Sequence, residues 1–439
     1  MNYTKIMRIL GAIVVSLIMT FSMSAQTPVP GVEQSKSILY INATIHIGNG
    51  EKVLDGAIGF DNGLIAFVGT TLNARKNLFE EIIDAEGQHI YPGFIAPNST
   101  LGLQEIGSVR ATRDQREVGD FNPHVRSIIA FQTESDITTT VRTNGVLLGQ
   151  VTPRGTFVGG QSSVVQFDGW NWEDALIAEE DGIHVYWPRM FERDHTGKLL
   201  SLKQKESYTT RITELKAKLK LAKVYNDRLH KEEIDVRLQA FSTLFTEAKT
   251  MYVHANSAKQ ITAAISLKRE FDLNKMVIIG GRESYLVTNL LKENEVGVML
   301  GRVHSLPWNE YDDVDLPYKI PQLLEEAGVN WCFENAGDKE QMNSRNLPFY
   351  AGTAVAYGLD YEKAVAGLTL NTAKMIGVDE KYGSLEVGKS ATLIVSAGDA
   401  LDMMTNDVKT AYIDGRKLAL TNRQIELYKK YQNKYANQN

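Results

Sequence analysis

The sequence predicts an α/β protein built around a (β/α)8 TIM-like barrel with a small β-domain attached. Eight apolar runs have the length of buried strands, segments with helical spacing lie between most of them, and β-rich segments flank the series at both ends. The eight runs extend from Tyr91 to about Glu334, close to the roughly 250 residues that an eight-stranded barrel occupies. An open, doubly wound sheet is the alternative, but no GxGxxG follows the first strand to favour it. The runs are YPGFIA, NGVLLGQV, SSVVQF, GIHVYW, TMYVHA, KMVIIGG, VGVMLG and VNWCFE.

Length and composition indicate a folded protein that does not bind nucleic acid. At 439 residues the chain can form one large domain with an accessory domain, or two or three smaller ones. Its formal charge is −6, and no basic cluster with interleaved aromatics occurs. The single cysteine, Cys332, lies in an apolar run. We expect it to be a buried, inert thiol, so that the fold depends on its core and not on a disulfide.

Residues 1–25 have the order of a secretory signal peptide. Lys5 and Arg8 precede an apolar run over 9–19, and small residues follow. The alternative, an uncleaved membrane anchor, is disfavoured because the run is shorter than the ~20 residues that a membrane span needs. We expect export across the inner membrane, a periplasmic mature protein and no membrane association after removal of the signal.

Two β-rich segments, 37–90 and 386–420, carry hairpin signals. Asn-Gly at 62–63 and Asp-Gly at 414–415 separate short apolar runs, and these dipeptides readily supply the positive φ angles of tight hairpin turns. The two segments could form separate caps. They could instead meet in space as one small sheet domain, since the termini of a domain often lie close together.

The segments between the strand candidates have amphipathic helical spacing. Within a Lys-rich stretch, four apolar residues fall on one helical face, and SAKQITAAISLKREF and EKAVAGLTLNTAKMIG show similar patterns. We therefore assign 91–385 to the barrel and 421–439 to a polar tail that forms a helix or a loose end. The four residues are Ile212, Leu215, Leu219 and Ala222.

Motifs near both ends of the barrel resemble the amidohydrolase superfamily, its imidazolonepropionase-like members in particular. QHIYPGFIAPNST is similar to the entry strand of that family, Pro-Gly-(Phe/Leu)-Ile-Asp-x-His-x-His, and GLTLNTAKMIGVDEKYGSLEVGKSATLIV resembles its closing signature. RNLPFYAGTAVAYGL and VHANSAKQITAA are also similar in style. The resemblance covers nearly the whole mature chain. It implies that the N- and C-terminal β-segments pair into one composite β-sandwich domain, and that the activity is hydrolysis of non-peptide carbon–nitrogen bonds.

The resemblance also implies one or two divalent metals, zinc being the family norm, and here the first strand departs from the pattern. Asn98 and Thr100 stand where the family has its paired histidines, and Ala96 stands where it has Asp. Residues i and i+2 of a strand point the same way, so His-x-His directs two imidazoles into the barrel mouth. Asn and Thr offer neutral oxygens, which bind Zn²⁺ poorly. We assign Asn98 and Thr100 to substrate binding.

The later strand ends retain one ligand position. His254 stands at the fifth strand and is our candidate for a vestigial metal ligand, although a lone histidine is more often a hydrogen-bonded barrel residue. The sixth strand ends in Gly-Gly at 280–281 where the family has another histidine. The fourth ends in Tyr-Trp-Pro at 186–188, without the bridging Lys or Glu of the family.

At the eighth strand, Glu334, Asn335 or Asp338 could match the catalytic Asp of the family. We favour Asp338 as the catalytic residue, because FENAGDKEQMNSRNLP is similar to family members whose acid lies a few residues before Arg-Asn-Leu-Pro. With so few ligands, we expect either no metal or one weakly bound divalent ion. The alternative is a relocated metal site built from three histidines near strand ends or loops: His124, His184 and His304.

Two functions therefore compete. One is a secreted hydrolase of a small molecule with an altered metal site; the other is an inactive relative that binds a small ligand or pairs with an active amidohydrolase. A purely structural secreted protein is disfavoured by the elaborate loops at the strand ends. Self-association into a homo-oligomer is compatible with either function. Metal content separates the first two, because the superfamily uses its metal to acidify water and polarise the scissile bond.

Overall fold

The computed structural model describes residues 29–193, 199–201, 205–226, 234–245, 249–336 and 340–436. The predicted signal peptide, residues 1–25, lies outside the described residues, as does the catalytic candidate Asp338.

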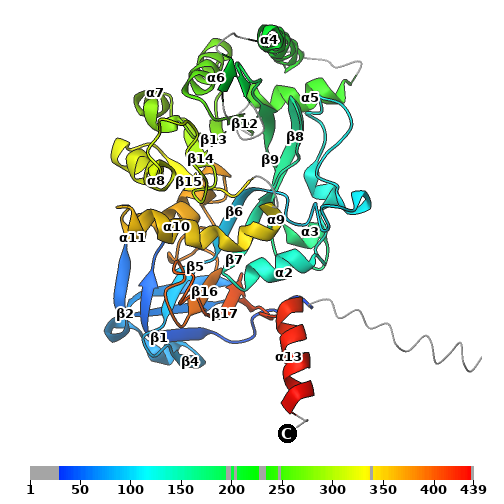
Figure 1. The fold of residues 1–439 in the computed structure, drawn as a ribbon. Coiled ribbons are helices and arrows are strands. Elements are labelled where there is room, and N and C mark those ends of the chain that lie inside the picture. Colours follow the sequence, from blue (N-terminus) through cyan, green and yellow to red (C-terminus); the bar gives the residue numbers. More distant parts are fainter. Residues whose placement is uncertain are drawn as a thin grey trace, which may run out of the picture.

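An eight-stranded, nearly closed sheet forms the barrel, and each of the eight predicted runs contributes a strand to it (Figure 1). The strands are apolar because both faces of the sheet are covered, by side chains of the barrel interior and by the surrounding helices. In spatial order they are β15 (Trp331–Phe333), β14 (Gly297–Leu300), β13 (Met276–Gly280), β12 (Thr250–Ala255), β9 (Leu176–Tyr186), β8 (Val158–Gln166), β7 (Val146–Val151) and β6 (Phe94–Ser99).

One strand of the barrel runs in the opposite direction to the others. β8 is antiparallel to both β7 and β9, whereas the remaining neighbours are parallel. The expectation of a regular (β/α)8 barrel is therefore wrong for the third strand. Only residues 152–157 connect β7 to β8, and a crossover that returns the chain in parallel needs a dozen or more residues. With so short a connection, β7 and β8 can pair only as an antiparallel hairpin.

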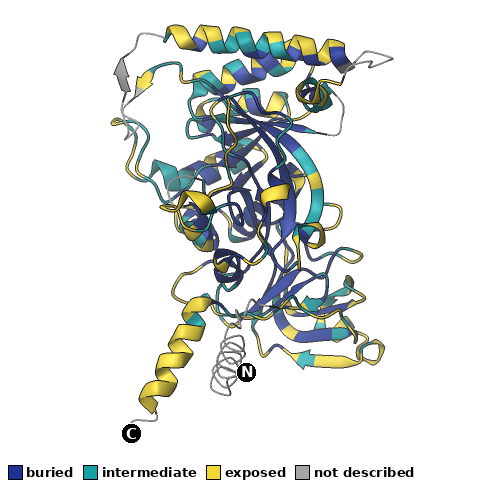
Figure 2. Ribbon diagram, turned by 90° about the vertical axis from the view of Figure 1, so that its right-hand side faces the viewer, coloured by how far each residue is buried: buried dark blue, intermediate teal, exposed yellow. Residues whose placement is uncertain are grey.

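Helices cover the outside of the barrel, and their buried stripes match the predicted ones (Figure 2). On α4, Leu215, Leu219 and Ala222 are fully buried, and α6 begins with a capping box formed by Ser257 and Gln260. The helices of the barrel are α2 (Asp136–Arg142), α3 (Trp172–Ala175), α4 (Glu206–Asn226), α5 (Val236–Ser242), α6 (Ala258–Phe271), α7 (Thr288–Glu293), α8 (Leu316–Ala327), α9 (Glu340–Asn343), α10 (Leu347–Ala356), α11 (Tyr361–Leu368) and α12 (Leu370–Met375).

A second, mixed sheet contains strands from both ends of the chain. β5 pairs with β16 in antiparallel register, so the two β-rich segments meet in space and are not separate caps. The structure describes one sheet here, and the β-sandwich stays a prediction. In order its strands are β18 (Arg416–Lys417), β17 (Val408–Ile413), β16 (Leu393–Ser396), β5 (His89–Pro92), β1 (Ile38–His46), β2 (Lys52–Asp61) and β3 (Leu64–Thr70), with β4 (Glu81–Asp84) against β1.

Both predicted hairpin turns form. Asn62 and Gly63, between β2 and β3, have φ angles of 48° and 79°, and Asp414 and Gly415, between β17 and β18, have 48° and 73°. Two consecutive positive φ angles are the requirement of a type I′ turn, whose twist matches that of the strands it joins.

The C-terminal helix, α13 (Arg423–Ala436), projects from the body of the protein and buries none of its residues (Figure 2). Among the described residues, no helix combines the length and apolar character needed to cross a bilayer.

Candidate functional site

The end of β6 carries Asn98 in an unusual backbone conformation. Its φ angle is +47°, and the pairing of β6 with β7 is irregular between Ala96 and Ser99. The backbone N–H of Asn98 donates to Gln150 Oε1 on β7 at 2.9 Å. Asn tolerates left-handed φ angles better than most residues. The alternation of side-chain direction along the strand, which we assumed for positions 98 and 100, is therefore interrupted at Asn98.

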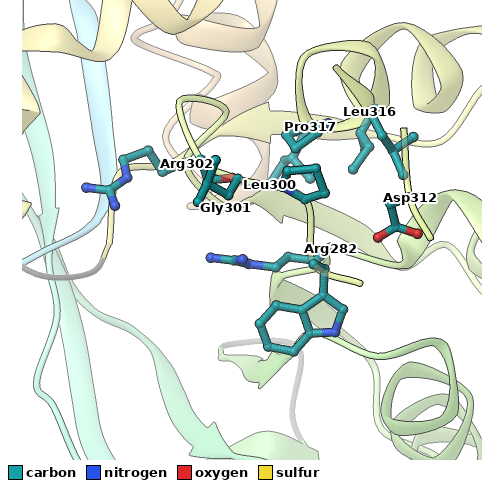
Figure 3. Close-up of a pocket in the computed structure, with 12 residues that line it drawn as sticks. Arg282, Leu300, Gly301, Arg302, Asp312, Leu316 and Pro317 are labelled. Atoms are coloured by element: carbon teal, nitrogen blue, oxygen red, sulfur yellow. The ribbon is translucent and has the colours of Figure 1, made fainter. Parts of the chain in front are cut away.

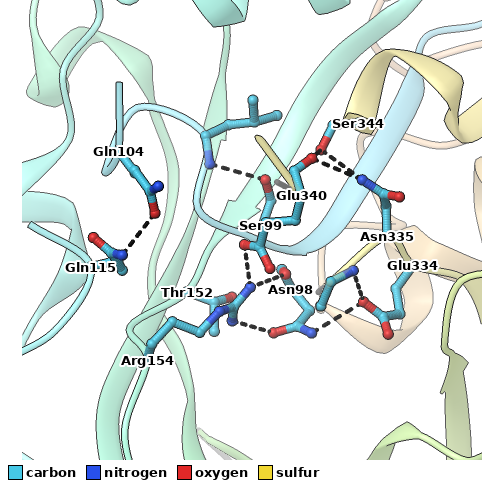
Figure 4. Close-up of polar contacts among 12 residues, drawn as sticks. Asn98, Ser99, Gln104, Gln115, Thr152, Arg154, Glu334, Asn335, Glu340 and Ser344 are labelled. Carbon is cyan, nitrogen blue, oxygen red and sulfur yellow. Dashed lines mark hydrogen bonds and ion pairs between the residues drawn. The ribbon is translucent and has the colours of Figure 1, made fainter. Parts of the chain in front are cut away.

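An arginine whose side chain is 15% exposed donates to both oxygens of Asn98 (Figure 4). Arg154 donates from Nη1 to Asn98 Oδ1 at 2.7 Å and from Nη2 to the Asn98 carbonyl at 2.8 Å. Its Nη2 also forms an ion pair of 2.5 Å with Glu340 on α9. Burial acts to lower the pKa of Arg154, but Glu340, Tyr186 and Glu334 together outweigh burial and raise it. A fixed positive charge therefore lies against the position that carries a metal-binding histidine in the resembling family.

Arg154 is not among the site residues predicted from the sequence. It lies in the loop that follows β7, and loops after strands form the functional end of such barrels. Its place in a loop after a barrel strand could have marked Arg154 as a candidate, but the family's metal-ligand motif has no arginine at this position.

Glu334, directly after β15, faces the same asparagine. Asn98 Nδ2 donates to Glu334 Oε2 at 3.2 Å, and the backbone N–H of Ala336 donates to the same oxygen at 2.5 Å. Burial raises the pKa of Glu334 to about 7. Asn335 points elsewhere, to Tyr350 and to the backbone of Glu340. Of the three acid candidates at the eighth strand, Glu334 is thus the one that the described residues bring to Asn98.

His254 is engaged by a second histidine. Its Nε2 lies 3.0 Å from Nδ1 of His184, whose own Nε2 lies 2.9 Å from Ser162 Oγ. The His254 ring also stacks on Tyr186, with 4.0 Å between ring centroids. Burial lowers the pKa of both histidines well below the ordinary value, so both rings are neutral at pH 7. This environment matches the alternative weighed for His254, a hydrogen-bonded barrel histidine.

A polar network fills the barrel between Asn98 and the histidine pair. Gln150, which accepts from Asn98, donates to Asp181 at 2.6 Å and to Ser162 at 3.2 Å. Tyr252 also donates to Asp181, at 2.6 Å. Asn98 and His254 are therefore linked through hydrogen bonds of the barrel interior.

The sixth strand has no room for a side chain at its end. Gly280 and Gly281 have φ angles of +97° and +56°. A Cβ atom at Gly280 would lie 2.6 Å from Asn256 Oδ1, and one at Gly281 would lie 2.6 Å from Val298 Cγ1. A histidine at either position would require local rearrangement.

Thr100 lies just beyond β6 and is buried, and its hydroxyl has no hydrogen-bond partner among the described residues. The histidines of the alternative metal site are not described as one cluster with His254: His304 bonds Thr353 at 2.7 Å, whereas His184, on β9, contacts His254. Within the described ranges, no group of three or more His, Cys, Asp or Glu residues is arranged to hold a metal ion.

The donor set does not fit a divalent metal. The Asn98 carbonyl oxygen accepts from a guanidinium, and His254 Nε2 faces another histidine. A metal ion at Asn98 would also meet the like charge of Arg154. Of the charged ligands that zinc prefers, Glu334 alone faces Asn98 among the described residues.

A pocket opens beside these residues, at the ends of β13 and β14 (Figure 3). The space that it encloses is about 20 Å³, and its mouth is open to solvent. Arg282 lies over the ring of Trp308, with its guanidinium carbon 4.7 Å from the ring centroid. Gly301 lines the pocket and also adjoins Glu334, because a Cβ atom there would lie 3.4 Å from Glu334 Oε1. Glu334 therefore connects the pocket and Asn98, because it adjoins Gly301 of the pocket and accepts a hydrogen bond from Asn98.

Comparison with known sequences identifies relatives over different parts of the chain. The model of the amidohydrolase family matches residues 318–418. An imidazolonepropionase of Bacillus mycoides (strain KBAB4) is 38% identical over 47 residues, 11% of each chain. The amidohydrolase tasK of Hapsidospora irregularis is 21% identical over 82% of this chain. These matches span only 11% and 39% of the length of those two relatives.

Solved structures cover nearly the whole described fold. An amidohydrolase from Thermotoga maritima MSB8 has a TM-score of 0.70 and 26% identity, over 87% of this chain and 99% of its own. An adenosine deaminase from Xanthomonas campestris with bound zinc has a TM-score of 0.51 and 15% identity, over 90% of this chain and 97% of its own, which supports the fold alone. The family-model match, the solved amidohydrolase structure and the barrel together support the amidohydrolase superfamily as the family of this chain.

Proposed function

We propose that this protein binds a small molecule at the mouth of its barrel and does not perform the metal-dependent hydrolysis of its superfamily. The observation that carries the proposal is the contact of Arg154 with both oxygens of Asn98. A guanidinium supplies positive charge, but it has no open coordination position and cannot take a proton from water near neutral pH. It therefore replaces the charge of a metal without replacing its chemistry.

The second candidate is hydrolysis of a non-peptide carbon–nitrogen bond without a metal, and Glu334 favours it. A carboxyl group whose pKa burial has raised to about 7 is suited to general acid–base catalysis at neutral pH. Glu334 would take a proton from the water that attacks the carbonyl carbon and return it to the leaving nitrogen. This candidate function requires that the unmodified protein hydrolyses such a bond and that the Glu334→Gln variant does not.

We further propose that the protein works in the periplasm, on the basis of residues 1–25. Its expected partners, besides the small ligand, are a second copy of itself or an amidohydrolase with intact ligands. Comparison of the mature N-terminus in a periplasmic extract with the encoded one tests the export step.

Removal of the arginine together with restoration of the first-strand histidines tests the main proposal. We expect the triple variant Asn98→His, Thr100→His, Arg154→Met to bind more Zn²⁺ than either the unmodified protein or the double variant that keeps Arg154. The double variant is the matched control, because it has the same imidazoles and differs only in the charge beside them. Equal zinc binding by the double and triple variants would contradict the role assigned to Arg154. Elemental analysis of dialysed protein provides the measurement.

A further inference from the structure

Two arginines of the pocket lack a counter-ion. The other arginines buried near the barrel are paired: Arg142 with Asp168 at 2.6 Å and Arg154 with Glu340 at 2.5 Å. Among the described residues, neither Arg282 nor Arg302 forms an ion pair or donates a hydrogen bond, and Nε of Arg302 is buried without a partner. Both residues are half-buried, and the Arg282 guanidinium meets the face of the Trp308 ring, so each charge is partly desolvated at a cost in free energy. Such a cost is offset when the site binds an anion.

Arg282 and Arg302 both line the pocket. Figure 3 shows both guanidinium groups extending toward the same side of the pocket. Burial lowers the pKa of Arg282, the carboxyl of Glu334 acts to raise it, and the charge of Arg302 lowers it further. The two arginines and Glu334 are therefore within electrostatic reach of one another. These three groups together carry about one excess positive charge when Glu334 is ionised, and the carboxylate of Asp312, which also lines the pocket, offsets it.

The remainder of the pocket is largely apolar. Asp312, at its rim, accepts from the backbone and side chain of Asn309, so its charge is already hydrogen-bonded. One part of the pocket is thus cationic, with Arg282 against one face of the Trp308 ring, and the rest of the lining offers mainly hydrocarbon. The side chains that form the apolar part are Leu300, Leu306, Pro307, Trp308, Leu316, Pro317 and Ile320.

We propose that this pocket binds a small organic acid, with its carboxylate between Arg282 and Arg302 and its apolar group against Leu316 and Pro317. Guanidinium groups match the planar geometry of a carboxylate. A monoanion suits the site better than a phosphate dianion, because the Glu334 carboxylate behind Gly301 repels additional negative charge. The inference rests on the proposed function, since it names the class of ligand that the barrel mouth takes.

A pair of probes of equal shape tests the carboxylate. N-acetyl-L-leucine carries a carboxylate, whereas N-acetyl-L-leucinamide is neutral and otherwise nearly identical. We expect the acid to bind at millimolar concentration or below, measured by calorimetry, and the amide to bind at least about tenfold more weakly, since charge-assisted hydrogen bonds are about twice as strong as neutral ones.

Variants of the two arginines assign the effect to the pocket. Arg282→Met and Arg302→Met should each weaken binding of the acid about tenfold or more and leave binding of the amide nearly unchanged. Arg282→Lys keeps the charge but loses the forked geometry, so it should bind the acid less tightly than the unmodified protein. Arg75→Met, at an exposed position in the connection between β3 and β4, is the matched control and should bind the acid normally.

The inference is wrong if the acid does not bind at millimolar concentration, or if acid and amide bind equally. It is also wrong if both methionine variants bind the acid as the unmodified protein does. Displacement of the acid by inorganic phosphate at lower concentration than by acetate would likewise overturn it. These outcomes are distinct from failure of the proposed function. Stoichiometric metal in the unmodified protein, with arginine-dependent acid binding intact, would remove the proposed function and leave this pocket in place.

Discussion

Arg154 decides what the neighbouring asparagine can do. Its guanidinium contacts Asn98 at two oxygens and Glu340 at a third, all within a buried region. Sequence reasoning correctly located Asn98 at a strand end, but it could not find the arginine. The contact joins residues 56 positions apart, and it depends on a loop conformation that local patterns do not specify.

Arg154→Met should be strongly destabilising. The substitution leaves the Glu340 carboxylate and two oxygens of Asn98 without their donor in a buried region. Removal of one partner of a buried ion pair costs about 3–5 kcal/mol. Urea denaturation should report a loss of this order, whereas Arg75→Met at an exposed position should stay within about 0.5 kcal/mol. A loss under about 1 kcal/mol for Arg154→Met would contradict the account of its contacts.

Glu334 should make stability depend on pH between about 4.5 and 7. Burial raises its pKa from 4.5 to about 7; Glu340 raises it too, while Arg154 and a hydrogen bond from Asn98 lower it, and Arg282 also lies within electrostatic reach. The folded state therefore holds the proton more tightly than the unfolded chain. Its stabilising contribution is complete below pH 4.5 and is lost as the pH rises through about 7, by about 3 kcal/mol at most.

Glu334→Gln isolates this contribution, because the amide oxygen can still accept from Asn98 and from the Ala336 backbone. We expect the free energy of unfolding of the variant, relative to the unmodified protein, to rise between pH 5 and pH 8 in urea titrations. Glu51→Gln, at an exposed position, should show no such change. A pH-independent difference for Glu334→Gln would show that the carboxyl is not held protonated in the fold.

At the scale of the elements, apolar periodicity identified all eight strands of the barrel and the buried face of α4, where three of the four predicted residues are buried and Ile212 is half-buried. The direction of β8 was missed, although the six residues between β7 and β8 already preclude a parallel return. The length of this loop predicts the direction of β8, whereas the number of strands does not. The bend at Asn98 could not be predicted, because its left-handed φ arises from tertiary hydrogen bonds to Gln150 and Arg154.

A side chain at Gly280, at the end of β13, should lower the stability of the fold. Gly280→Ala places a methyl group 2.6 Å from Asn256 Oδ1 at a φ angle of +97°. Gly87→Ala is the matched control, because Gly87 has a φ of +83° with no atom within 4 Å of the added Cβ. Both variants incur the backbone strain of about 1 kcal/mol or more. Thermal unfolding should show Gly280→Ala to be the less stable by about a further 1–3 kcal/mol, the usual cost of overpacking. Equal losses would mean that the space at Gly280 is open.

At the scale of the whole molecule, the two ends of the chain depend on each other. β16 supplies the antiparallel partner of β5, which continues after Gly93 into the first barrel strand. Deletion of 386–439 should therefore expose the edge of β5 and yield insoluble protein. Deletion of 423–439 alone, which removes a helix with no buried residues, should shift the melting temperature little. Soluble, cooperatively melting protein from the longer deletion would contradict the dependence of the barrel on this sheet.

The molecule as a whole combines the barrel of a metal-dependent superfamily with a mouth built of neutral oxygens, glycines and an arginine. Metal content of the unmodified protein, purified without chelators and measured by elemental analysis, tests this most directly. We predict far less than one equivalent of Zn²⁺, Mn²⁺ or Fe²⁺ per chain, because Asn98 and Thr100 stand in place of imidazoles and Arg154 brings a like charge. One equivalent of tightly bound metal that survives dialysis would contradict the account.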